Sequence, residues 1–413
     1  MVELVVELYG VAIGRLTGDG RTFDFDADAG AIEEFGLDSL VMSVAVPLAV
    51  VPARARRGRR QNFFRELLPE GRMLTRLAQQ AGTSEHDVVA LLRAYGRDVA
   101  GALQIWDPEM PGEPRTPAVE PLTPRGVADL LSEVASFPLA NKPQGGKTSL
   151  AGVQDKVVLV RTSTGWARAL DGYPSTHILK PASRDHPTII YDEEYGARIA
   201  RALGLADFDT RITEFDGVPA LVVERYDREG GAGDSPPQRI HQEDFNQVLG
   251  TQGDQKYQRF GGKASFLRVA RELTTLGDRR SVRRLARMTV LSAAIGNLDL
   301  HAKNLALLHP RDGSVQLAPA YDVVPQAHLP NDGELALAVD RVYRHAAITR
   351  AHLVAEIHSW GVRDADHVVD ESLAAVLETV SVETPDPRAH PGLVDDIVRF
   401  ATNLRAGREA GHH

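Results

Sequence analysis

The alternation of apolar and polar positions along the chain predicts an α+β protein whose two halves differ in kind. In the first half, short apolar runs with a period of two end at Gly, Asp or Asn, which is the pattern of strands joined by tight turns. In the second half, apolar residues recur every three or four positions, as on one face of a helix. The chain therefore reads as a sheet-rich half followed by a helical half.

The expected strands form an amino-terminal group and a central group. In the first, the alternation turns at Gly10 and Gly14, and strand composition resumes at Ser39. In the second, hairpins are expected about Ser163 to Gly165 and about Asp216–Gly217, a dipeptide typical of a two-residue turn. The expected strands are residues 2–15, 39–48, 96–106, 157–162, 166–170 and 175–181, two strands within 210–226, and short strands at 305–308 and 315–317.

The expected helices begin near residue 62 and carry capping signals. Thr83 and Ser84 precede one of them, with Asp87 placed to complete a capping box, and Thr123 with Pro124 opens another. Between strands and helices, the five arginines of Arg54 to Arg60 are predicted to be a solvated loop rather than a phosphate or partner contact. The expected helices are residues 71–80, 85–95, 124–134, 193–205, 241–250, 264–275 and 279–297, and three amphipathic helices after Thr349.

Composition limits the class of protein. The 413 residues are 43% hydrophobic, enough for a core, and the net charge of -9 disfavours broad attraction to nucleic acid. The absence of cysteine excludes disulfides and thiolate metal sites. The amino terminus lacks the basic start of a signal peptide and no apolar run reaches membrane-spanning length, so a cytoplasmic protein is expected.

The proline-rich segment 107–125 marks a boundary, and the expected units are 1–110, 111–227 and 228–413.

Candidate chemistry lies in Gly296 to Asn304, GNLDLHAKN, together with Asp322 in APAYDVVP. In protein kinases an Asp accepts the proton of the incoming hydroxyl, an Asn follows after four residues, and this Asn and a downstream Asp hold Mg²⁺. Asp299, Asn304 and Asp322 have that spacing. The HRD, DFG and APE motifs of eukaryotic protein kinases are absent from the sequence.

An isolated D-x-x-x-x-N is usually a turn, because Asp and Asn satisfy nearby backbone groups. Its companions favour phosphoryl transfer: a glycine-bearing loop in Asn141 to Val160 runs into strands, the third of which ends near Lys180. A helix follows with Glu193 or Glu194, either of which could pair with Lys180 as in kinases or merely complement the helix dipole. A nucleotide-pocket hinge would fall at Glu224 to Tyr226.

With these residues identified, the sequence resembles the HipA family of serine/threonine kinases, the toxin half of a bacterial toxin–antitoxin pair. The resemblance covers most of the chain up to Asp322 and implies a two-lobed, protein-kinase-like fold, with a mixed-sheet N-lobe, a helical C-lobe and ATP in the cleft. The matching segments, in the family's order, are LLPEG, GRDVAGALQ, TSLAGVQDK, STHILKP, VERYDR, HQEDF, GNLDLHAKN and YDVVP.

The resemblance also implies roles for individual residues. Asp299 is the expected catalytic base, and Asn304 and Asp322 are the expected Mg²⁺ ligands. Ser149 occupies the position of the serine that family members autophosphorylate, which expels the loop and inactivates the kinase. The residues expected to contact ATP are Ala151, Gly152, Val153, Gln154, Asp155, Lys156, Lys180, Glu224, Arg225, Tyr226, His301, Asn304, Tyr321 and Asp322.

The expected function is therefore an ATP- and Mg²⁺-dependent serine/threonine kinase. By resemblance its substrate is an aminoacyl-tRNA synthetase, glutamyl-tRNA synthetase being the leading example, and its partner is a HipB-like helix-turn-helix antitoxin that binds operator DNA. Two alternatives stay open. One is a non-catalytic corepressor in a DNA-bound complex, and the other is a kinase for lipids or small molecules.

Overall fold

The amino-terminal part of the chain is an antiparallel sheet covered by helices. In the computed structural model, which describes residues 2–20, 22–141, 148–150, 154–230 and 236–412, the strands are ordered β3-β2-β1-β4. Leu4, Leu16, Phe63 and Phe64 are fully buried between sheet and helices. The elements are β1 (Val2–Leu8), β2 (Val11–Gly18), β3 (Asp24–Ala27), α1 (Ala29–Phe35), α2 (Arg57–Arg65), α3 (Gly71–Ala81), α4 (Val88–Tyr95) and β4 (Leu103–Trp106). The predicted sheet over 2–15 is confirmed, and of the strand predicted over 96–106 only Leu103–Trp106 forms a strand.

The strand predicted at 39–48 is wrong. Met42 and Leu48 are fully buried, which explains the apolar pattern, but the backbone forms no strand. Instead, Glu243 accepts hydrogen bonds from the Val44 amide at 2.8 Å and from the Ser43 hydroxyl at 2.6 Å. A distant carboxylate thus satisfies polar groups that a neighbouring strand would otherwise pair with.

The loop predicted for Arg54 to Arg60 is also wrong, because Arg54–Arg56 form a 3₁₀ turn that leads into α2. The predicted exposure to solvent is confirmed for the other four arginines and is wrong for Arg60. Arg60 is 5% exposed and donates to both carboxylate oxygens of Asp24 at 2.6 and 2.9 Å. At least this arginine therefore fixes α2 to the sheet. Similarly, Asp87 alone caps α4 by accepting from the Ala90 amide, so that helix begins later than predicted.

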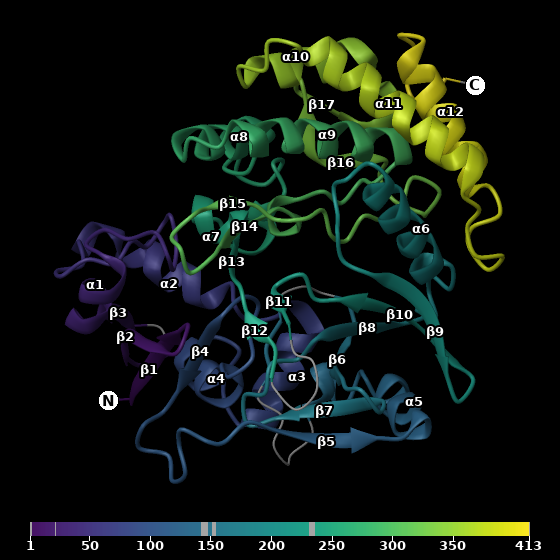
Figure 1. Cartoon of the computed structure of the whole chain (residues 1–413). Helices are drawn as coiled ribbons and strands as arrows, with labels where there is room; N and C mark the ends of the chain where they lie inside the picture. Colours follow the sequence, from purple (N-terminus) through teal and green to yellow (C-terminus); the bar gives the residue numbers. More distant parts are fainter. Residues whose placement is uncertain (1, 21, 142–147, 151–153, 231–235, 413) are drawn as a thin grey trace.

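A six-stranded sheet, ordered β5-β7-β6-β8-β10-β9, comes from the middle of the chain and is called the central sheet for that reason. It lies in the lower part of Figure 1, beside the purple amino-terminal part. Ala220 and Val222 pack with α5 on one face, whereas Leu221 between them packs with α6 on the other. The predicted hairpins are confirmed, and the proline-rich segment unexpectedly supplies an edge strand. The elements are β5 (Ala118–Leu122), α5 (Pro124–Ser132), β6 (Val157–Arg161), β7 (Trp166–Leu170), β8 (His177–Pro181), α6 (Ile189–Ala202), β9 (Thr210–Phe215) and β10 (Val218–Glu224).

The last part of the chain is mainly helical and lies above the central sheet in Figure 1. The helix predicted over 241–250 is half wrong: it is a strand, β13 (His241–Asp244), followed by the short helix α7 (Phe245–Leu249). The other predicted helices are confirmed. The elements are β11 (Arg228–Glu229), β12 (Gln238–Arg239), α8 (Phe266–Thr275), α9 (Arg279–Ile295), β14 (Ala306–His309), β15 (Gln316–Leu317), β16 (Glu334–Val339), β17 (Val342–Arg344), α10 (Arg350–Ser359), α11 (Ala365–Val382) and α12 (Leu393–Arg405).

The predicted α+β class, with a lobe of sheet and helix and a helical lobe, is confirmed, and the strands of the two larger sheets pair antiparallel rather than as a mixed sheet. Of the helices in the described part of the chain, none combines the length and the apolar character needed to cross a bilayer. The division into units at residues 110 and 227 stays a prediction.

Helix α6 touches the Asp322 segment without an intervening side chain. A Cβ added to Gly196 would lie 2.1 Å from the Val323 carbonyl oxygen and 3.0 Å from Pro325 Cδ. The Gly196→Ala variant is expected to separate helix and segment and to lower the free energy of unfolding by about 1–3 kcal/mol, measured by urea titration. Gly58→Ala in α2 meets nothing within 4 Å and should instead stabilise by up to about 1 kcal/mol. Equal effects from the two variants would contradict the contact.

Candidate functional site

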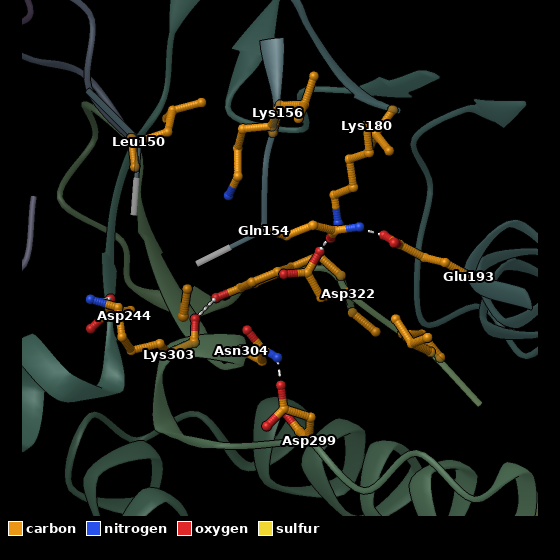
Figure 2. Close-up of a pocket in the computed structure, with 18 of the residues that line it drawn as sticks. Leu150, Gln154, Lys156, Lys180, Glu193, Asp244, Asp299, Lys303, Asn304 and Asp322 are labelled. Atoms are coloured by element: carbon orange, nitrogen blue, oxygen red, sulfur yellow. Dashed lines mark hydrogen bonds and ion pairs between the residues drawn. The ribbon is translucent and has the colours of Figure 1, made fainter. Parts of the chain in front are cut away.

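A cavity of about 530 Å³ lies between the central sheet and the helical lobe, with walls from both. Lys180 and Glu224 come from the sheet, Glu193 from α6, and Asp299 and Asp322 from the helical lobe. Figure 2 shows Lys180, Glu193, Asp299 and Asp322 around one space, so residues from distant parts of the chain meet in one place.

Lys180 is held between two carboxylates. It pairs with Leu221 across the β8–β10 ladder, and cross-strand partners share a sheet face, so its side chain extends toward α6. Its Nζ lies 2.6 Å from Glu193 Oε1 and 2.6 Å from Asp322 Oδ1. Glu194 instead pairs with Arg198 at 3.0 Å. Of the two glutamates that the sequence left open, Glu193 is therefore the partner of Lys180.

The two carboxylates keep Lys180 charged. Burial would lower its pKa, but Asp322 and Glu193 outweigh burial and raise it. Burial would likewise raise the pKa of Asp322, and the ammonium groups of Lys180 and Lys156 outweigh that effect and lower it. Asp322 has φ +51°, an uncommon backbone conformation for a non-glycine residue that often marks a functional site.

Asp299 and Asn304 bracket a short loop after α9. The helix ends at Gly296, whose φ of +69° allows the chain to turn into the loop. The Asn304 side-chain nitrogen donates to the Asp299 carbonyl oxygen at 2.9 Å, which closes the loop and leaves the amide oxygen for the cavity. Burial raises the pKa of Asp299 from 3.8 to about 6, a value suited to a general base near neutral pH.

These residues fit a magnesium ion that is also bound by phosphates. Mg²⁺ prefers oxygen ligands and is commonly held by one or two protein groups together with substrate phosphates. The Asp322 carboxylate and the Asn304 amide oxygen provide such groups on one side of the cavity. Within the described residues, no three His, Cys, Asp or Glu side chains gather as a metal site.

Aromatic rings form another part of the cavity wall. The Tyr226 and Tyr321 ring centroids are 5.6 Å apart, and the Tyr321 hydroxyl donates to the Lys303 carbonyl at 2.6 Å. His301 lies against Tyr257 with ring centroids 5.3 Å apart, and its Nε2 is 3.9 Å from Asp299 Oδ2. Burial lowers the pKa of His301 to about 3, so its imidazole is neutral at pH 7.

Glu224 and Arg225 also border the cavity, but their side chains have partners elsewhere. Arg225 is 3% exposed and donates to Asp227 at 2.7 and 2.9 Å and to the Ser175 hydroxyl at 2.8 Å. Glu224 accepts from the Asp209 amide at 3.1 Å. At this hinge, the Arg225 guanidinium therefore makes its hydrogen bonds to other groups of the protein.

The predicted phosphate loop is described only at its ends. Ala151, Gly152 and Val153 lie outside the described residues. Gln154 and Lys156 line the cavity, and burial lowers the pKa of Lys156 to about 8. Asp155 is half-buried and is not part of the cavity wall.

Ser149, the expected modification site, is fully buried. Its hydroxyl donates to the Leu67 carbonyl at 2.9 Å and its amide donates to the Asp98 carbonyl at 2.9 Å. In this position, the hydroxyl is engaged with the amino-terminal part of the chain.

Several cavity residues escaped the sequence reasoning. Lys303 lies inside GNLDLHAKN, but a lysine in a loop carries little signal by itself. Tyr257 lies beside Asp299 and donates a hydrogen bond that lowers the pKa of that carboxyl, against the larger effect of burial. The others come from segments distant in sequence, and only the fold brings them together: Glu66, Gln242, Asp244, Gln247 and Lys256.

Comparison with known proteins gives matches over most of the chain. The family model of the HipA-like C-terminal domain matches residues 148–381, and that of the HipA N-terminal domain matches residues 4–106. Y4mE of Sinorhizobium fredii is 35% identical over 328 residues, 77% of either chain. The serine/threonine-protein kinase toxin HipA of Shewanella oneidensis is 28% identical over 376 residues, 87% of this chain and 84% of that protein.

The fold is likewise similar to a solved one. A chain in the complex of Shewanella oneidensis MR-1 HipA, HipB and operator DNA superposes with a TM-score of 0.78 at 24% identity, covering 98% of this chain and 96% of that chain. This similarity concerns the fold.

The ion pair between Lys180 and Glu193 can be tested by measuring the stability of variants. Lys180 and Glu193 are both 5% exposed, so Lys180→Met leaves a buried carboxylate without its cation. We expect the free energy of unfolding in urea at pH 8 to fall by about 3–5 kcal/mol, and Lys180→Met/Glu193→Leu to recover most of the loss. The exposed Lys263→Met is the control and should change it by no more than about 0.5 kcal/mol. Equal losses in the single and double variants would contradict a buried ion pair.

Proposed function

The chain belongs to the HipA family of kinase toxins, and from that premise we propose that it is an ATP- and Mg²⁺-dependent serine/threonine protein kinase. The observation that carries the proposal is the convergence of Lys180, Asn304, Asp322 and Asp299 on one cavity large enough for a nucleotide. Phosphoryl transfer depends mainly on positioning and on charge stabilisation, and these residue types supply both.

In the proposed reaction, Lys180 binds the nucleotide phosphates, and Glu193 holds its ammonium in place. Asp322 and Asn304 would hold Mg²⁺, which when bound would neutralise charge on the phosphates. Tyr226 and Tyr321 flank the nucleobase, with the backbone of Glu224 to Tyr226 along its edge. Gln154 and Lys156, with Ala151, Gly152, Val153 and Asp155, belong to the proposed phosphate loop.

Asp299 is the proposed general base. Its carboxylate accepts the proton of the incoming serine or threonine hydroxyl while the oxygen attacks the terminal phosphorus of ATP and ADP leaves. His301, neutral and packed against Tyr257, lines the space beside Asp299.

The proposal extends to partners. One solved structure with a similar fold is a HipA in complex with HipB and operator DNA, and this supports a HipB-like helix-turn-helix antitoxin as partner, with contact to DNA mainly through that partner. An aminoacyl-tRNA synthetase, glutamyl-tRNA synthetase first, is the proposed protein substrate, and its phosphorylation would inhibit translation. A catalytically silent corepressor and a lipid or small-molecule kinase are the competing functions.

The first test is transfer of phosphate. Purified protein with ATP, Mg²⁺ and a panel of synthetases should label one of them, and Asp299→Asn should lower kcat by roughly 10²–10⁴-fold while binding ATP as before, because the base acts on the hydroxyl. Asp312→Asn, in an exposed turn, is the matched control and should keep full activity. ATP binding without transfer by the unaltered protein would support the corepressor, and labelling of only lipids or small molecules would support the third function.

The pH dependence gives a second test. Because burial raises the pKa of Asp299 to about 6, the base is protonated below that pH and free above it. We therefore expect kcat to rise with pH through about 6 and then to level off. If kcat instead rose through about pH 4, the range in which an unperturbed Asp titrates, the assignment of Asp299 as a base in this environment would be contradicted.

The third test concerns Ser149. Its buried hydroxyl offers no room for a phosphate of nearly two negative charges, so phosphorylation would require the segment to leave its place against Leu67. We propose autophosphorylation there with loss of activity. Mass spectrometry after incubation with ATP should find phosphate on Ser149, and Ser149→Ala should stay active for longer. An unmodified Ser149 in a protein that loses activity with time would refute this regulation.

A further inference from the structure

A cluster of charged side chains joins the amino-terminal part of the chain to the loop of Asp299 and Asn304. Lys303 Nζ lies 2.6 Å from Glu66 Oε2, 3.3 Å from Glu70 Oε1 and 3.7 Å from Asp244 Oδ2. Lys256 Nζ lies 2.7 Å from Glu70 Oε2. Glu66 is the C-cap of α2 and directly precedes LLPEG, and Glu70 lies within LLPEG before α3, whereas both lysines belong to the helical lobe.

Lys303 is fixed at both ends. Its ammonium is bound by Glu66, and its carbonyl accepts the hydrogen bond from Tyr321, the residue before Asp322. The next residue is Asn304, whose side chain closes the loop onto Asp299. A shift of Lys303 would therefore move Asn304 and, through it, the backbone of Asp299.

Glu66 has a second partner from the helical lobe. It is 5% exposed and also accepts from the Asn246 side chain at 3.2 Å, next to Asp244, which caps α7. Lys256 lies directly before Tyr257, the neighbour of Asp299. The two glutamates thus hold both segments that surround the proposed base.

Buried ion pairs rarely stabilise a fold more than well-packed apolar residues would, and fixing one arrangement is their better-supported use. We propose that Glu66 and Glu70 are positioning residues for phosphoryl transfer: by holding Lys303 and Lys256, the amino-terminal part of the chain sets the geometry of Asn304 and Asp299. The kinase site is then complete only with residues 66–70. This inference rests on the proposed function.

The experiment compares Glu66→Gln with Glu113→Gln in the full chain. Glu113 is an equally buried glutamate, 2.9 Å from Arg97, and lies outside the cavity wall. Glu66→Gln should lower kcat roughly 10–100-fold and raise several-fold the Mg²⁺ concentration for half-maximal rate, because a shift of about 1 Å in the reacting geometry has effects of this size. ATP binding should be unchanged, and Glu113→Gln should keep normal kinetics.

Two further measurements separate positioning from general destabilisation. If Glu66 acts through Lys303, the double variant Glu66→Gln/Lys303→Met should have the same kcat as Lys303→Met alone. Hydrogen–deuterium exchange should quicken in residues 299–306 of Glu66→Gln and stay unchanged there in Glu113→Gln.

Exchange does not depend on catalysis, so the two proposals can fail separately. If the unaltered protein transfers no phosphate, the proposed function fails, and exchange still tests the positioning. If exchange in residues 299–306 is the same in Glu66→Gln and the unaltered protein, or if kcat and the Mg²⁺ dependence of an active enzyme are unchanged, the positioning role of Glu66 is refuted.

Discussion

The Lys180 ammonium, bound at 2.6 Å by Glu193 and by Asp322, is the interaction on which the site depends. It joins the central sheet, α6 and the helical lobe at a single point. The carboxylates of Glu193, which is buried, and Asp322, which is partly exposed, would repel each other without the cation between them. The cavity therefore has its shape only while all three side chains are in place, and the direct contact of Gly196 with the Val323 carbonyl keeps α6 at the required distance.

Local signals in the sequence predict part of this site. Alternation predicts the strand that ends near Lys180, and spacing within one loop predicts Asp299 and Asn304. These signals leave open whether Glu193 or Glu194 meets Lys180, because both lie on one turn of α6 and only the direction in which the helix packs on the sheet decides between them. That direction depends on tertiary contacts, such as the one with Leu221.

The predictions that are wrong have a common physical cause: in each segment, a contact with a residue distant in sequence determines the structure, rather than the local sequence pattern. The apolar run from Ser39 is buried yet forms no strand, because Glu243 binds its backbone. Arg60 is drawn out of solvent by Asp24, and the segment of His241 becomes a strand because β14 pairs with it. The charged cluster at Glu66 and Lys303 could not be foreseen for the same reason, since its members are 237 residues apart.

The contact between segment 39–48 and Glu243 also affects the protein during its synthesis on the ribosome. Its Ser43 and Val44 groups are satisfied by Glu243, which follows 199 and 200 residues later in the chain. At translation rates of about 5–20 residues per second, that carboxylate emerges roughly 10–40 s after the segment it binds. During this interval, the Ser43 hydroxyl and the Val44 amide remain accessible to water or to a chaperone.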